Sequence, residues 1–126
     1  MATLDFVVFP PRWLVAEHTF KPPYYHRNCM SEYMGNISGE YDAKGKGFGP
    51  GCSSLHSCMT PHGPDCESYE NFVKSEQKPY KIKDGNFSFM FESGFLLKTT
   101  KWALEDVLKV DCDYYKDWLK LADVKY

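Results

Sequence analysis

The hydrophobic pattern of the chain is mostly one of short strands. Residues 6–9 form an apolar run that stops at Pro10 and Pro11, as expected for a short buried strand. A glycine-rich stretch over residues 39–51 is expected to connect two strands like a hairpin loop. Similar apolar or alternating runs predict further strands over residues 31–37, 55–59, 86–91 and 95–100.

The strongest strand signal lies at residues 86–91. Phe87, Phe89 and Phe91 recur at every second position, which places them on one face of a strand. The Asp84-Gly85 pair just before them is typical of a tight turn. This segment is therefore expected to belong to an antiparallel sheet.

Near the C-terminus the period changes to that of a helix. Asp113 is a candidate N-cap for a helix whose apolar positions are Tyr114, Tyr115, Trp118, Leu119, Leu121 and Ala122. Many short strands followed by one helix favour a mainly β fold. We expect a single domain over residues 1–126, a cupin-like jelly roll or antiparallel β-barrel with a C-terminal helix.

Composition excludes several classes of protein. With 15 basic and 17 acidic side chains the net charge is −2, which does not favour binding to nucleic acid or an anionic membrane. No apolar run approaches the roughly 18 residues that span a bilayer. Five cysteines without a C-x-x-C pair fit a disulfide framework poorly and favour a cytoplasmic location. Zinc bound through Cys58, Cys66 and nearby histidines remains a weaker alternative.

Residues 26–62 contain the side chains best suited to chemistry. Two imidazoles and one carboxylate can occupy one face of an octahedral iron ion, which points to His26, Glu32 and either His56 or His62. His26 and Glu32 would share a strand face if the backbone between them were extended. A loose cupin-like spacing favours His56 as the third ligand. Alternatively, Glu32 pairs with Arg27 and the histidines are ordinary surface or core residues.

The chain contains long motifs that are rich in uncommon residues, at positions 9–13, 19–32, 47–48, 54–65, 89–93 and 100–102. These motifs resemble the homogentisate 1,2-dioxygenase family, in the C-terminal part that carries its iron, and the resemblance covers nearly the whole chain. It implies an Fe(II)-dependent dioxygenase that cleaves the ring of homogentisate with O2 to give 4-maleylacetoacetate in tyrosine and phenylalanine breakdown. The iron ligands that it implies are His26, Glu32 and His62.

The resemblance also assigns the substrate side of the site. Tyr41, His56 and His62 are expected to face homogentisate, and Asn28, His56 and Tyr41 are candidates for hydrogen bonds that orient the ligands. The histidine proposed as the family's catalytic base lies upstream of the matching segment, so no residue here takes that role. Cys52 stands where the family usually has glycine, which puts the local turn in question.

Family members are several times longer, with a large N-terminal domain before this segment. We therefore expect a β-barrel that is incomplete at its N-terminal edge. We also expect association, either with an N-terminal domain or in a trimer-based homo-oligomer. Two alternatives to an active enzyme remain open: a catalytically incompetent metal-binding cupin, and one half of a split enzyme that needs a partner chain.

Overall fold

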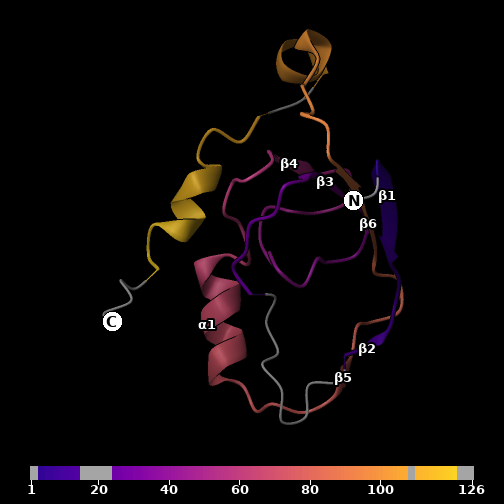
Figure 1. The fold of residues 1–126 in the computed structure, drawn as a ribbon. Helices are drawn as coiled ribbons and strands as arrows, with labels where there is room; N and C mark the ends of the chain where they lie inside the picture. Colours follow the sequence, from indigo (N-terminus) through magenta and orange to yellow (C-terminus); the bar gives the residue numbers. More distant parts are fainter. Residues whose placement is uncertain (1–2, 15–23, 108–109, 122–126) are drawn as a thin grey trace.

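The computed structural model, which describes residues 3–14, 24–107 and 110–121, is built around one antiparallel sheet (Figure 1). Its four strands lie in the order β1 (Leu4–Phe9), β6 (Phe87–Ser93), β3 (Ser31–Ser38) and β4 (Ser53–His56). A smaller sheet pairs β2 (Trp13–Leu14) with β5 (Tyr80–Lys81). The mainly β, antiparallel architecture expected from the sequence is thus confirmed.

The register sorts the side chains of the large sheet between its two faces. Asp5, Glu92, Glu32 and His56 are direct neighbours across the four strands. The next row consists of Phe6, Phe91, Tyr33 and Leu55. Because successive residues point to opposite faces, one face is acidic and histidine-containing and the other is aromatic.

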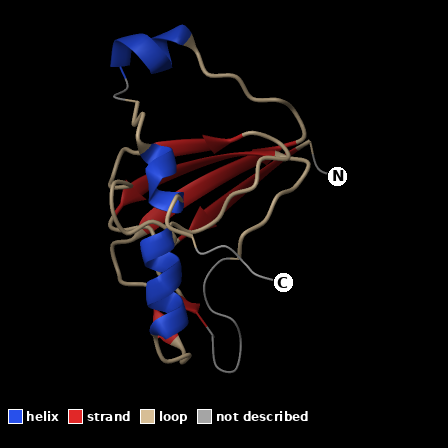
Figure 2. Cartoon of the chain, turned by 90° about the vertical axis from the view of Figure 1, so that its left-hand side faces the viewer, coloured by secondary structure: helices blue, strands red, loops and turns tan. Residues whose placement is uncertain are grey.

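Three helical segments accompany the sheets. Helix α1 (Cys66–Lys74) contacts the 3-10 helix η2 (Tyr114–Trp118), and both run along one flank of the sheet (Figure 2). The π-helix η1 (Trp102–Val107) stands away from them, at the opposite end of the view in Figure 1. No helix within the described ranges is both long and apolar enough to cross a membrane.

The sequence did not predict α1, although its start carries a signal. The carboxylate of Asp65 accepts a hydrogen bond from the backbone N–H of Ser68 at 2.7 Å and caps the helix. Such a cap stabilises a helix by about 1 kcal/mol. Capping at Asp65 begins the helix directly after the segment that contains His62.

Polar side chains make up much of the buried interior. Among the described residues, the buried apolar ones include Met34, Ala43, Phe48, Pro64, Cys66 and Ile82, and the buried polar or charged ones include Ser31, Glu32, Asn36, Lys44, Asp65, Ser88 and Ser93. Buried polar groups need hydrogen-bond partners. Asn36 illustrates this, since its amide donates to the carbonyls of Gly39 and Phe48, both at 2.9 Å. Much of the interior is thus held by specific hydrogen bonds.

The strands predicted at residues 6–9, 31–37 and 86–91 are confirmed as β1, β3 and β6. The strand predicted at 55–59 is wrong in position. Strand β4 ends at His56, and the chain then turns with Met59 at a φ of 63°, a left-handed conformation that a strand does not contain. The predicted hairpin is confirmed, because β3 and β4 pair across the loop of residues 39–51.

Two further predictions are corrected. Residues 95–100 form no strand, because the chain leaves the sheet at Gly94; the Ser93 hydroxyl donates to the carbonyl of Thr3 at 2.8 Å and accepts from the N–H of Phe95. The C-terminal helix is a single 3-10 segment, and the side chain of Asp113 makes no capping hydrogen bond. Ala122 lies outside the described residues. Across the described strands the sheet stays open and does not close into a barrel.

The turn at Cys52 is regular. The preceding Gly51 takes the left-handed φ of 84°, and the N–H of Cys52 donates to the carbonyl of Gly49 at 3.0 Å. Because Gly51 carries the unusual conformation, an exposed cysteine fits at position 52.

Candidate metal centre

His26 and His62 are brought together by the main chain. Each backbone N–H donates to the carbonyl of the other residue at 2.9 Å, so that two loops meet in an isolated antiparallel bridge. Their ring centres lie 4.4 Å apart. The backbone between His26 and Glu32 is not extended, because the chain bends at Cys29 and Met30 before β3 begins. The position of His26 is therefore set by its backbone pairing with His62. It does not share a strand face with Glu32.

A backbone carbonyl two residues earlier orients each of these imidazoles. The Nδ1 atom of His26 lies 2.9 Å from the carbonyl oxygen of Tyr24, and that of His62 lies 2.9 Å from the carbonyl oxygen of Thr60. Because a carbonyl oxygen only accepts, Nδ1 is the donor in both contacts. A neutral ring in this tautomer presents the lone pair of Nε2, which is the form that binds a metal ion.

The carboxylate of Glu32 lies between the two imidazoles. Nε2 of His62 is 2.9 Å from Oε2, and Nε2 of His26 is 3.8 Å from Oε1. Glu32 is buried, with 5% of its surface exposed. One ligand atom from each of the three residues lies within 4.8 Å of the others, and this group contains no cysteine. This donor set is typical of a site for a divalent transition metal. It fits such a site better than the alternative in which Glu32 forms an ordinary ion pair with Arg27.

Asn28 fixes the orientation of the Glu32 carboxylate. Its side-chain amide donates to Oε1 of Glu32 at 2.8 Å, and its Oδ1 accepts from the N–H of Met30 at 2.6 Å. The backbone carbonyl of Asn28 accepts from the N–H of Met59 at 2.8 Å. Held at three points, Asn28 leaves Oε2 of Glu32 directed at His62.

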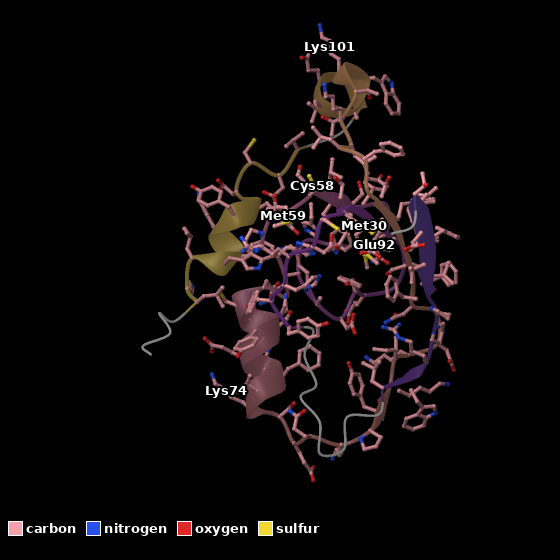
Figure 3. All side chains as sticks on the ribbon, in the orientation of Figure 1. Met30, Cys58, Met59, Lys74, Glu92 and Lys101 are labelled. Atoms are coloured by element: carbon pink, nitrogen blue, oxygen red, sulfur yellow. The ribbon has the colours of Figure 1, made fainter. Side chains whose placement is uncertain are left out.

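A second acidic side chain lies beside the first. The amide of Asn28 also reaches Oε1 of Glu92 at 3.5 Å; Glu92, on β6, is labelled in Figure 3. Burial and the neighbouring carboxylate of Glu32 raise the pKa of Glu92. The sequence did not single out Glu92, since its link to Glu32 is a pairing across strands distant in the chain.

His56 lies next to the three-residue group but outside it. It pairs with Glu32 across β3 and β4, and its ring stacks on that of His62 with centres 4.3 Å apart. Burial, reinforced by the nearby His62, lowers the pKa of His56 to about 4. The ring is therefore neutral at pH 7. The structure thus brings together the three residues that the resemblance implies, His26, Glu32 and His62, and leaves His56 outside this group.

All three residues predicted to face the substrate line one cavity of about 180 Å³. These are Tyr41, His56 and His62, and His26 and Glu32 share the same wall. Burial, together with the carboxylate of Asp42, raises the pKa of Tyr41, so its hydroxyl stays a hydrogen-bond donor. Sequence reasoning missed further residues that line the cavity: Lys44, Glu92, Tyr114 and Trp118.

Comparison with known proteins relates the chain to one family. Residues 1–125 match the family described as "Homogentisate 1,2-dioxygenase C-terminal". The chain is 57% identical over 118 residues to homogentisate 1,2-dioxygenase of Mus musculus, which covers 94% of the chain and 26% of that protein. The Arabidopsis thaliana enzyme is 58% identical, with 96% of the chain and 26% of that protein covered. The Dictyostelium discoideum enzyme is 55% identical, with 98% and 28% covered.

The chain thus spans about a quarter of the length of these curated relatives. The match nevertheless includes every residue of the candidate metal centre, since it extends over residues 1–125. On these grounds the chain belongs to the homogentisate 1,2-dioxygenase C-terminal family.

Proposed function

We propose that His26, Glu32 and His62 hold an Fe(II) ion, and that the protein works as a homogentisate 1,2-dioxygenase. In this reaction O2 cleaves the aromatic ring of homogentisate and gives 4-maleylacetoacetate, a step of tyrosine and phenylalanine catabolism. The observation that carries the proposal is the convergence of three ligand atoms within 4.8 Å beside a cavity. The names of the relatives support the choice of substrate.

The residues present fit such an ion. Both imidazoles have Nδ1 engaged by a carbonyl, so each offers Nε2, and Glu32 supplies the single negative charge. Two histidines and one carboxylate on one face leave the remaining positions of an octahedral metal open. When bound there, iron supplies a common site for the aromatic substrate and dioxygen and a route for electrons between them.

The side chains around the cavity would bind and orient the substrate. The Tyr41 hydroxyl remains protonated and donates a hydrogen bond, whereas the neutral imidazole of His56 either donates or accepts one. Met34, Met90 and Phe48 give the cavity apolar walls that suit an aromatic ring and exclude water. We assign the substrate contacts to Tyr41, His56 and His62.

Catalysis needs more than these residues. We assign no catalytic base to this chain, and we propose that the base histidine comes from the N-terminal domain of the family. The chain spans about a quarter of the length of the relatives, and the proposed base would lie in the part of the family that this sequence does not cover. A cupin-like fold, a trimer-based oligomer and a cytoplasmic location complete the proposal.

Iron loading followed by oxygen uptake tests the proposal. The 126-residue chain is loaded anaerobically with Fe(II), and bound iron and O2 consumption with homogentisate are measured. We expect stoichiometric iron in the parent and in His56→Ala, and none in His62→Ala. A parent that binds no iron, or a His62→Ala variant that binds as the parent does, contradicts the ligand assignment.

The same assay separates the two alternatives. Stoichiometric iron with no oxygen uptake, even after the N-terminal domain of a relative is added, identifies a metal-binding cupin without activity. Oxygen uptake and 4-maleylacetoacetate that depend on the added domain identify one half of a split active site.

A further inference from the structure

The short C-terminal helix η2 has an unusual distribution of exposure. Only Tyr114 and Trp118 are partly buried between residues 110 and 121, whereas Tyr115 and Leu119 are 58% and 69% exposed. Both partly buried side chains line the cavity of the candidate metal centre. This helix therefore contributes little to an apolar core but forms part of the cavity wall.

Trp118 contacts the segment that carries His62. Its indole N–H is shared between the carbonyl of Pro64, at 2.9 Å, and that of Gly63, at 3.3 Å. The hydroxyl of Tyr25 donates to the same Pro64 carbonyl at 2.8 Å. The two residues that follow His62 are thus held by one donor from η2 and one from the neighbour of His26.

The fit around Gly63 is tight. A Cβ atom added there would lie 2.5 Å from the ring of Tyr25, closer than any side chain allows. The segment can therefore approach Tyr25 only with glycine at this position, and the carbonyl of the same glycine accepts the hydrogen bond from Trp118. A shift of this segment would move His62 relative to Glu32.

Lys44 ties η2 to the same place. Its side chain is buried, with 5% of the residue exposed, and its ammonium lies 5.0 Å from the ring centre of Tyr114 and 5.2 Å from that of Trp118. It pairs with Asp117 on η2 and lies 4.0 Å from the Asp65 carboxylate that caps α1. A buried ammonium needs such partners, so its burial fixes the helix against the loop.

We infer that Trp118 is a positioning residue for the metal centre: through the carbonyls of Gly63 and Pro64 it sets the place of His62. This inference rests on the proposed function, because it concerns the same three ligands. Replacing a residue that supports a metal ligand through hydrogen bonds typically changes metal affinity 10–100-fold.

Replacing Trp118 by Phe tests the inference, because the ring facing Lys44 remains while the N–H donor is lost. We expect Co(II) to bind about tenfold more weakly, with an altered visible absorption spectrum of the bound ion. The matched control is Trp102→Phe, since Trp102 lies on η1 and is 61% exposed. Both variants are first compared with the parent by circular dichroism and thermal unfolding.

If Trp118 has a purely structural role, Trp118→Phe will unfold at a lower temperature, but its cobalt affinity and cobalt spectrum will equal those of the parent. That result would overturn the inference. Should that variant not fold, Tyr25→Phe removes the other donor to the Pro64 carbonyl and is expected to change the cobalt spectrum in the same way. An unchanged spectrum there is equally contradictory. A parent chain that binds no cobalt refutes the metal centre itself.

Discussion

Glu32 and Tyr33 are adjacent on β3, and they show how differently the two faces of the sheet are used. Glu32 is 5% exposed among His26, His62 and Asn28. Tyr33 is 37% exposed on the opposite face, in the row that contains Phe6 and Phe91. The polar side chain is enclosed and the aromatic one meets solvent, which reverses the usual arrangement in a soluble sheet.

The contrast extends along the strands of the sheet. On the aromatic face Phe6 stacks on Phe91 with ring centres 4.7 Å apart, yet Phe6 remains 59% exposed. The site face is instead covered by the loop of residues 39–51 and by η2, which line the cavity. One face therefore carries the candidate metal centre, and the other exposes aromatic side chains to solvent.

The largest difference between the faces is expected from a change to Glu32. Glu32→Gln keeps the shape of the side chain but removes the charge, so Co(II) affinity should fall by more than about 100-fold, beyond the effect of losing an outer hydrogen bond. Tyr33→Gln, on the next residue, should bind Co(II) as the parent does. Co(II) titration followed by visible absorption measures the affinity of both variants. An equal loss of affinity in the two would contradict the assignment of different roles to the two faces of the sheet.

A smaller loss of Co(II) affinity is expected from a change to Asn28, because its side chain contacts Glu32 and would not contact a metal ion bound there. Asn28→Ser removes the amide that donates to Oε1 of Glu32, and Co(II) affinity should fall about tenfold. Asn71→Ser, on the exposed surface of α1, provides the control. Equal affinities of the two variants would show that the carboxylate needs no such support.

The aromatic face should reveal itself in association. Phe6→Lys introduces a charge on this face, and we expect the chain to self-associate about fivefold more weakly, which corresponds to roughly 1 kcal/mol. Leu96→Lys, at an exposed position beyond the end of β6, should have no effect. Sedimentation at several protein concentrations compares them, and Co(II) binding should be unchanged in both.

The smallest effect concerns alkaline pH. Burial raises the pKa of Tyr41 above its ordinary value of 10.0, so the folded chain holds this proton where the unfolded chain releases it. The contribution of Tyr41 to stability is therefore complete below pH 10 and declines as the pH rises above it. We expect Tyr41→Phe to be less sensitive than the parent to unfolding between pH 10 and 11. Equal phenolate absorbance in the two folded proteins at pH 10.5 provides an independent check.

The sequence predicted correctly those strands whose residues show a local apolar run or an alternation of apolar and polar positions. Phe87, Phe89 and Phe91 alternate because they lie on one face of strand β6, which has a two-residue side-chain period. The end of β4 could not be read in this way, because the turn at Met59 depends on a left-handed φ that methionine rarely adopts. Helix α1 was missed because few of its residues are apolar, although Asp65 followed by Ser68 marks its cap.

The three residues of the candidate metal centre were singled out through family resemblance, whereas spacing alone left His56 and His62 as alternatives. Spacing fails because His62 is placed by its pairing with His26, 36 positions away in the chain. The roles of Lys44 and Trp118 are harder still to predict from sequence. Lys44 contacts Asp117 and Trp118 contacts Pro64, and no repeating sequence pattern links the segments that these contacts join. Long-range contacts of this kind become visible only in three dimensions.

The reciprocal hydrogen bonds between His26 and His62 have a consequence for how the centre assembles. Because each residue anchors the backbone of the other, the spacing of the two imidazoles is settled when the chain folds. For the proposed metal centre this means that a cation would meet ligands that are already ordered, and little conformational entropy would be lost on binding. The same stiffness couples the ligands mechanically, so that a displacement of either loop is transmitted to both imidazoles together.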